Sequence, residues 1–281
     1  MKFASMTTLA AALAVAAGVA GADEDAELVI NGETPIVTKL DAPDGHPLTE
    51  ILSGWRFRTD ETQGLETDDF DNPAFIFVEQ AMDAWETVEG TENKSCASCH
   101  GDVEESMAGV RAGMPKWNAA AEDLWSLENY INDCRVNRMG AEPYKWDKPD
   151  MNAMAALIGL QSRGMPVDVA IDGPAEEWFK KGEEMYYTRF GQLELACSNC
   201  HEDNYGNMIR ADHLSQGQTN GFPTYRLKNA KLNSIHGRFK GCIRDTRAHT
   251  FAPGSAEFRA LELYVAWRGA GLSVETPSVR N

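Results

Sequence analysis

Cys96-Ala97-Ser98-Cys99-His100 and Cys197-Ser198-Asn199-Cys200-His201 are two copies of the pentapeptide C-x-x-C-H. This pattern is typical of covalent c-type haem attachment, in which both thiols add to the vinyl groups and the adjoining histidine ligates the iron. A zinc site would need a second pair of ligands about 12–20 residues away, and neither copy has one. The sequence therefore predicts two haems, one at Cys96 and Cys99 with His100, the other at Cys197 and Cys200 with His201.

The regions around the two motifs match, which indicates an internal duplication. The first cysteines lie 101 residues apart, and a glycine precedes each of them by six residues, at Gly90 and Gly191. Apolar and aromatic residues recur at helical spacing before each glycine, at Phe75 to Trp85 and at Ala175 to Tyr187. A unit of roughly 100 residues suits a small domain, and this one resembles a class I cytochrome c domain. Because strand patterns are weak, we predict a mainly α fold of two such domains in tandem.

Composition divides the chain into four segments. Residues 1–22 contain Lys2, an apolar run and a small-residue cleavage pattern, which predict a cleaved export signal and a periplasmic protein. That run is too short to cross a bilayer and no later stretch is long enough, so we expect no membrane span. Residues 23–55 are acidic and contain prolines, which favours an extended N-terminal arm. We place the domain of the first haem at 56–172 and the domain of the second haem, with the active site, at 173–281.

The chain is strongly acidic, with 26 Lys and Arg against 43 Asp and Glu and a net charge of −17. Such a charge repels phosphate and argues against a nucleic-acid partner. The segment from Arg226 to Arg247 departs from this balance, because it carries seven basic residues and a single acid, Asp245. Its field concentrates small anions and stabilises a thiolate at Cys242, which lies inside it. The segment around Cys134 has fewer positive charges, so we infer that the second haem is the working site.

Cys134 and Cys242 are left over after the four haem-attaching cysteines and occupy corresponding places in the two halves. Three explanations are open: each is the second axial ligand of its haem, the two form one disulfide, or both are ordinary buried cysteines. A thiolate ligand lowers the reduction potential of a haem, which suits chemistry at the haem better than simple electron relay. Competing axial ligands are Met107, Met114, Met139, Met151, Met154 and Met208, and, for the second haem, His213, His236 and His249.

The chain resembles the SoxA family of dihaem cytochromes over essentially its whole length after the export segment. The resemblance rests on both C-x-x-C-H motifs, on Cys134 and above all on the block Gly237 to Arg247, GRFKGCIRDTR. The stretches Phe251 to Ser255, FAPGS, and Leu261 to Gly269, LELYVAWRG, also match. The resemblance implies that Cys134 and Cys242 are axial ligands of the first and the second iron.

The same resemblance implies an activity. The family partners with SoxX, a monohaem cytochrome c, in a heterodimer, and oxidatively joins thiosulfate to a cysteine thiol of the SoxYZ carrier, as an L-cysteine S-thiosulfotransferase. Cys242 would carry a persulfide and act as the catalytic residue. Arg238 would bind the substrate, with Lys240 and Arg247 as further candidates. Electrons would leave through the c-type haems to a downstream cytochrome.

Three other functions fit the motifs without the resemblance. A dihaem electron carrier with no chemistry of its own would work normally after Cys242→Met, and it gives no reason for the basic segment. A dihaem peroxidase needs an iron with an open position, and the matched cysteines in both halves count against it. A haem-based sensor would exchange an axial ligand for a gas, so the visible spectrum of its reduced form would change with carbon monoxide.

Overall fold

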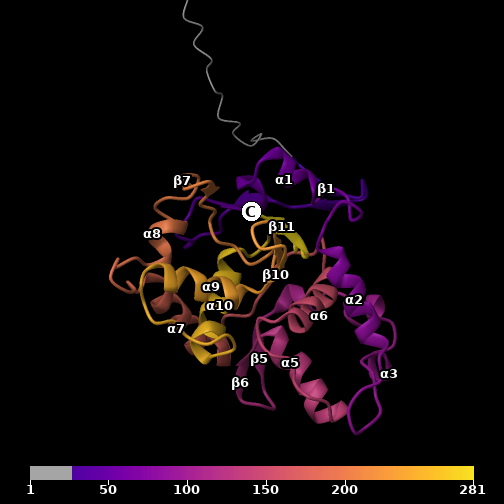
Figure 1. The fold of residues 1–281 in the computed structure, drawn as a ribbon. Coiled ribbons are helices and arrows are strands. Elements are labelled where there is room, and N and C mark those ends of the chain that lie inside the picture. Colours follow the sequence, from indigo (N-terminus) through magenta and orange to yellow (C-terminus); the bar gives the residue numbers. More distant parts are fainter. Residues whose placement is uncertain (1–26) are drawn as a thin grey trace, which may run out of the picture.

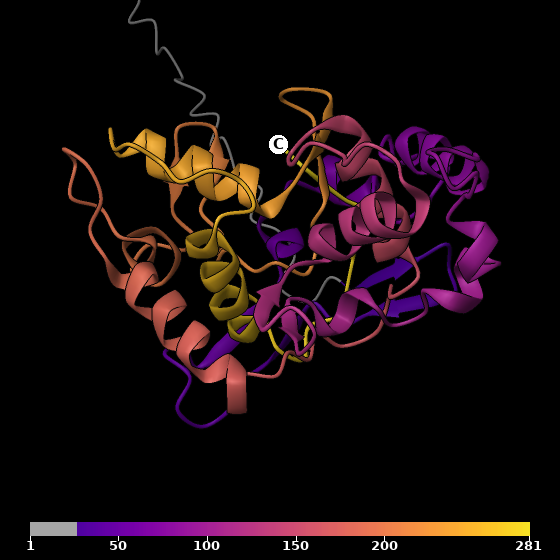
Figure 2. The ribbon, with the colours of Figure 1, turned by 90° about the horizontal axis from the view of Figure 1, so that it is seen from below.

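Two helical halves lie side by side in the structure, and the N-terminal strands run across one end of both (Figure 1). Seen from below, the helices of the second half lie on one side and those of the first half on the other (Figure 2). The computed structural model describes residues 27–281, so the predicted export segment 1–22 and the start of the predicted arm lie outside the described residues. Within residues 27–281, no helix is long and apolar enough to span a membrane.

The first half is built on the packing of α2 (Phe75–Glu86) against α6 (Pro149–Leu160). α2 buries Val78, Ala81 and Trp85, whose spacing of three and four residues puts them on one face of the helix. α6 is buried on nearly all sides, which agrees with its apolar composition. Along the chain, the elements that connect α2 to α6 are α3 (Ala97–His100), α4 (Val103–Ser106), the turn η2 (Arg111–Gly113), the hairpin of β5 (Lys116–Asn118) and β6 (Asp123–Trp125), α5 (Leu127–Asp133) and the π-helix η3 (Cys134–Met139).

The second half is built in the same way on α7 (Glu176–Tyr187) and α10 (Ala256–Arg268). Gly182 allows the two helices to approach closely, because a Cβ atom there would lie 2.1 Å from the carbonyl oxygen of Ala260. The elements around these helices are the turn η4 (Gly173–Ala175), α8 (Cys197–His201), β7 (Met208–Ile209), β8 (Asp212–His213), β9 (Thr224–Arg226), β10 (Lys231–Asn233) and α9 (Ile235–Asp245).

The glycine before each C-x-x-C-H motif has the same structural task in both halves. Gly90 and Gly191 have positive φ angles of 73° and 65°. A Cβ atom would lie 2.1 Å from the backbone oxygen of Met139 in the first case, and 2.2 Å from that of Thr246 in the second. Each glycine is therefore required where the loop before the motif crosses the end of the helix that carries the third cysteine of its half, η3 or α9.

The helices that lead to the third cysteine of each half, α5 and α9, also begin alike. Ser126 precedes α5 and Ser234 precedes α9 as N-caps, each eight residues before the third cysteine of its half. Cys134 and Cys242 lie 108 residues apart, whereas the motifs lie 101 apart, so the second half has seven more residues between its motif and this helix. The short hairpin of β7 and β8 forms in that longer connection.

The N-terminal segment is folded into hairpins, whereas the sequence predicts an extended arm and weak strand content. β1 (Leu28–Ile30) pairs antiparallel with β2 (Thr34–Ile36), and β3 (Lys39–Asp41) pairs with β4 (Glu50–Leu52). These strands are three residues long, too short for an alternating pattern to be recognised in the sequence. The turn η1 (Gly54–Phe57) and α1 (Asp60–Gly64) follow.

The C-terminal segment contacts both halves. Gly164 donates its N–H to the carbonyl oxygen of Val274 at 2.9 Å. The chain then returns to the second half, where β11 (Ser278–Arg280) pairs in parallel with β9, which itself pairs antiparallel with β10. In the connection between the halves, Val167 and Val169 are buried. The halves are therefore joined by packed chain rather than by a free linker.

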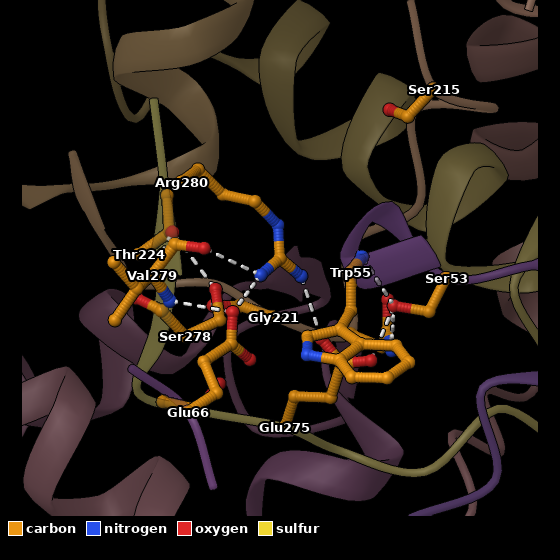
Figure 3. A network of polar contacts seen from close by, with 12 residues as sticks. Ser53, Trp55, Glu66, Ser215, Gly221, Thr224, Glu275, Ser278, Val279 and Arg280 are labelled. Carbon is orange, nitrogen blue, oxygen red and sulfur yellow. Dashed lines mark hydrogen bonds and ion pairs between the residues drawn. The ribbon is translucent and has the colours of Figure 1, made fainter. Parts of the chain in front are cut away.

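A buried ionic network fastens the N-terminal segment to β11. The guanidinium of Arg280 lies between the carboxylates of Glu66 and Glu275 (Figure 3), with Nη2 2.6 Å from Glu275 Oε2 and Nη1 in contact with Glu66 Oε1. Ser53 donates its hydroxyl to the other oxygen of Glu275. Burial raises the pKa of Glu66 to about 8, although the charge of Arg280 opposes this shift. The network fixes the segment that carries Arg58 beside the strand pair β11–β9.

Candidate functional site

The first C-x-x-C-H motif lies on α3, with Cys96 as its N-cap residue. Trp85, from α2, donates its ring N–H to the carbonyl oxygen of Gly101 at 2.9 Å, and its ring lies 5.7 Å from that of His100. The thiol of Cys134 lies close enough to Cys96 to raise its pKa, after the larger effect of burial. The structure thus brings Cys134, from the start of η3, to the first motif.

The second motif presents a histidine that is ready to bind iron. The ring Nδ1 of His201 lies 2.7 Å from the carbonyl oxygen of Ser215, which can only accept, so Nδ1 carries the proton and Nε2 keeps its lone pair. Burial lowers the pKa of His201 to about 4, so the ring is neutral. Gly217 packs against this ring, since a Cβ atom there would lie 2.9 Å from it. This hydrogen bond fixes the orientation that an axial histidine needs.

Cys242, on α9, lies at the second motif. Its charge raises the pKa of both Cys197 and Cys200, in each case after the larger effect of burial. All six cysteines, which fall within the described residues, are free thiols. Cys134 and Cys242 lie at separate motifs, so the predicted alternative of a disulfide between them is wrong. In each half, two thiols, a histidine and a third cysteine therefore form a donor set that fits a covalently attached haem.

His236 is not free to ligate a haem, because both of its ring nitrogens are used. Nε2 lies 3.1 Å from Glu262 Oε2, and Nδ1 accepts the N–H of Gly254 at 2.9 Å. Of the other competing ligands, Met151 and Met154 pack in the core of the first half, Met208 is exposed on β7, and His249 is exposed.

Arg238 and Cys242 share one face of α9, because residues four apart in an α-helix lie one above the other. The negative charge of Cys242 raises the pKa of Arg238 more than any other group does, while burial opposes it. Lys240 lies two residues before Cys242 and so points away from this face, and both Lys240 and Arg247 are exposed. Substrate binding by Lys240 and Arg247 stays a prediction.

Three further charged residues surround the Arg238 face. Arg226, at the end of β9, and Arg58, from the N-terminal segment, lie close enough to Arg238 for its charge to lower the pKa of both, after the larger effect of burial. Asp212, on β8, forms an ion pair with Arg58, and Arg58 also donates to the carbonyl oxygen of His213 at 2.9 Å. Arg226 donates its Nε–H to the carbonyl oxygen of Asn281 at 2.8 Å. Arg58, Arg226 and Asp212 therefore gather around Arg238, and of the three arginines Arg238 and Arg226 lie close enough to Cys242 for its charge to act on them.

Sequence reasoning counted Arg226 among the basic residues of its segment but gave it no role, and it missed Arg58 and Asp212. Aligning the halves at Cys134 and Cys242 would have pointed to Arg226, because the corresponding residue of the first half is the uncharged Asn118. Nothing in the sequence places Arg58 at the site, since it is 184 residues from Cys242 and arrives through tertiary packing.

The chain is similar to known proteins. A family model described as SoxA/TsdA, cytochrome c domain, matches residues 80–167. The L-cysteine S-thiosulfotransferase subunit SoxA of Rhodovulum sulfidophilum is 56% identical over 287 aligned positions that cover all of both chains. The protein of the same name from Paracoccus pantotrophus is 54% identical, over 98% of this chain and 97% of the relative.

A solved structure agrees with these sequence matches. The crystal structure of SoxXA from P. pantotrophus contains a chain that matches with a TM-score of 0.88 and 54% identity, covering 92% of this chain and 99% of that chain. Near-complete coverage at this identity extends to both halves and to the N-terminal segment that brings Arg58 near Arg238. The chain therefore belongs to the SoxA family of L-cysteine S-thiosulfotransferase subunits.

Proposed function

We propose that this chain, together with a SoxX cytochrome, oxidatively joins thiosulfate to a cysteine thiol of a SoxYZ carrier protein, as a haem-dependent L-cysteine S-thiosulfotransferase. The names of the relatives that are 54–56% identical over nearly the whole chain support this activity. The observation that carries the proposal is the shared face of Arg238 and Cys242 on α9, with Arg226 and Arg58 beside it. A positive site in a chain of net charge −17 selects a small dianion against its surroundings.

The proposal includes two c-type haems on two tandem cytochrome c-like domains that arose by duplication. Each half offers its own C-x-x-C-H motif, its own third cysteine and a long helix before and after them, which supports one haem for each half. His100 and Cys134 would be the axial ligands in the first half, and His201 and Cys242 in the second. Such a haem supplies one-electron acceptance next to the cysteine sulfur.

The residues of the second half bind and orient the substrate. The sulfonate oxygens of thiosulfate accept hydrogen bonds from Arg238 and Arg226, whose planar guanidinium groups suit a tetrahedral oxyanion. This binding directs the terminal sulfur towards the sulfur carried by Cys242. Asp212 forms an ion pair with Arg58 and so fixes this third guanidinium at the edge of the site.

The overall reaction balances as an oxidation by two electrons. One S–S bond forms between the terminal sulfur of thiosulfate and the carrier cysteine, the carrier thiol loses its proton, and two electrons leave. Cys242, extended by a persulfide sulfur, holds the thiosulfate group until the carrier thiolate displaces it by attack on sulfur. The electrons pass to SoxX and then to a downstream cytochrome.

We also propose where in the cell this reaction takes place. We assign the protein to the periplasm, on the strength of the export pattern in residues 1–22. The structure match to SoxXA supports a heterodimer with SoxX.

Intact-mass spectrometry tests the proposal. The haem-loaded chain in complex with SoxX is incubated with thiosulfate, SoxYZ and an oxidant, and the mass of both proteins is measured. We expect two haem masses on this chain and a gain of one thiosulfate group on the carrier that requires the oxidant. If the haems are loaded and the carrier gains no mass, the chain is a dihaem electron carrier and the basic segment is a docking surface.

A further inference from the structure

A buried carboxylate joins α5, which leads directly into η3 and Cys134, to α9, which carries Cys242. This contact crosses the boundary between the halves. Glu262, on α10 of the second half, accepts two hydrogen bonds on its Oε2 atom. One comes from the hydroxyl of Ser126, the N-cap residue of α5 in the first half. The other comes from Nε2 of His236, on α9, at 3.1 Å. A single oxygen atom is thus the common partner of both helices.

The environment keeps Glu262 ionised. Burial favours its neutral form, but the hydrogen bond from His236 and the positive charge of Arg111 lower its pKa. The pKa of the neighbouring Glu128, on α5, is raised by burial and by the charge of Glu262. Arg111 comes from η2, and its Nη1 donates to the carbonyl oxygen of Met114. The carboxylate of Glu262 therefore lies near the guanidinium of Arg111, and both side chains are buried.

His236 is held firmly enough to transmit this contact to α9. Its ring is fully buried and stacks on Trp146 of the first half, with centroids 5.1 Å apart and planes 8° apart. Its Nδ1 accepts the N–H of Gly254. A second tie runs in the opposite direction, since Ser234, the N-cap residue of α9, donates to Asp147 of the first half at 2.8 Å. The first turn of α9 therefore cannot shift without breaking both contacts.

The distance along each helix to the cysteine is short. His236 lies six residues before Cys242, which is about 9 Å along α9, and Ser126 lies eight residues before Cys134. We propose that Glu262 is a positioning residue that holds α5 and α9 in one fixed relation and so sets the approach of Cys134 and of Cys242 to their irons. This proposal rests on the two haems of the proposed function, and its own content is the link between them.

Four variants of the full chain in complex with SoxX separate the link from general stability. Ser126→Ala removes the tie to α5 together with the N-cap hydroxyl of that helix, and His236→Phe keeps the stacked ring but removes the tie to α9. Glu262→Gln weakens both ties, and Glu257→Gln is the matched control, because Glu257 is exposed on the same helix. The readout is the electron paramagnetic resonance spectrum of the oxidised protein, which resolves the two low-spin irons, together with steady-state kinetics.

We expect Ser126→Ala to shift the signal of the iron at Cys134 and His236→Phe to shift that at Cys242. Glu262→Gln should shift both and lower kcat about tenfold with little change in the KM for thiosulfate, as loss of an outer-shell partner does. Glu257→Gln should shift neither signal. Wild-type signals in Glu262→Gln, or equal shifts of both irons in Ser126→Ala and His236→Phe, would overturn the proposal. If Glu262→Gln does not fold, those two variants decide. A wild-type chain with only one haem mass contradicts the proposed function instead.

Discussion

The surroundings of Cys134 and Cys242 share one backbone plan and differ in charge. The residue four positions before the cysteine is Tyr130 in the first half and Arg238 in the second. The residue at the end of the first hairpin strand is Asn118 in the first half and Arg226 in the second. Tyr130 lies close enough to Asn118 for a hydrogen bond that lowers its pKa, although the larger effect of burial raises it. At the corresponding place in the second half, the guanidinium groups of Arg238 and Arg226 lie near each other. The fold thus places a third cysteine at each C-x-x-C-H motif, and the two places differ in charge, with arginines only at the second.

Two further differences follow the same line. In the first half the nearest arginine, Arg135, is already engaged: it pairs with Glu89 at 2.6 Å and stacks on Tyr144 at 3.6 Å. In the second half the longer connection after the motif forms β8, whose Asp212 holds Arg58 at the site. The cation of the first half therefore forms structural contacts, whereas arginines of the second half lie near its cysteine.

The largest effect among the surrounding residues should come from Arg238→Tyr, which gives the second half the residue of the first. Loss of a charge-assisted hydrogen bond of about 2–3 kcal/mol should lower kcat/KM for carrier conjugation about 100-fold. Tyr130→Phe is the matched control and should keep the wild-type value. A loss of less than threefold in Arg238→Tyr would show that Arg238 does not bind the substrate.

Arg226→Asn should have a smaller effect, because Arg238 remains on the same face of α9 as Cys242. We expect the KM for thiosulfate to rise about tenfold with kcat nearly unchanged, as for a residue that binds ground state and transition state equally. Lys228→Gln, two residues further along and exposed, serves as the control. If kcat falls while KM stays constant, Arg226 acts in the reaction step instead of in binding.

Lys240→Gln and Arg247→Gln should change kcat/KM by no more than about twofold at physiological salt, because exposed charges are strongly screened. Their effect should grow at low ionic strength, where the field of the whole segment guides the anion. Steady-state rates at two salt concentrations check this. A tenfold loss at physiological salt for either variant would restore it as a direct substrate ligand.

Glu66→Gln should alter the pH dependence of stability and leave the first-half motif untouched. Folding raises the pKa of Glu66 from 4.5 to about 8, so its proton stabilises the fold fully below pH 4.5, and this stability is lost as pH rises through 8. The wild-type Tm should therefore fall relative to that of Glu66→Gln between about pH 5 and about pH 9. Thermal unfolding by circular dichroism measures the difference, and the exposed Glu92→Gln should run parallel to the wild type. Parallel curves for Glu66→Gln would mean that Glu66 is ionised in the folded protein.

Much of this fold could be predicted from local sequence patterns. The C-x-x-C-H motifs, Gly90 and Gly191 and the helical periodicity are short-range features, and the structure confirms the helices around them. The third cysteines were recognised by their spacing, and excluding a disulfide between them needed the fold, whereas their role as axial ligands stays a prediction. The hairpins of residues 28–52 were missed because their strands are too short for a pattern.

The long-range part of the site could not be read from the chain in order. Arg58 meets Asp212 only because the buried Arg280 network fixes the N-terminal segment against β11. Glu262 links Ser126 and His236, which lie 136 and 26 residues away. Such contacts depend on how the halves pack, and no local propensity encodes them.

The central claim is that conjugation takes place at Cys242 and that Cys134 is auxiliary. The direct test compares Cys242→Ala with Cys134→Ala, both in complex with SoxX and with haem content verified by mass, by the initial rate at which the carrier gains the thiosulfate group. We expect a loss of at least about 1000-fold for Cys242→Ala, as for removal of a covalent catalyst, and less than about tenfold for Cys134→Ala. Equal losses in both variants, or a wild-type rate in Cys242→Ala, would contradict it.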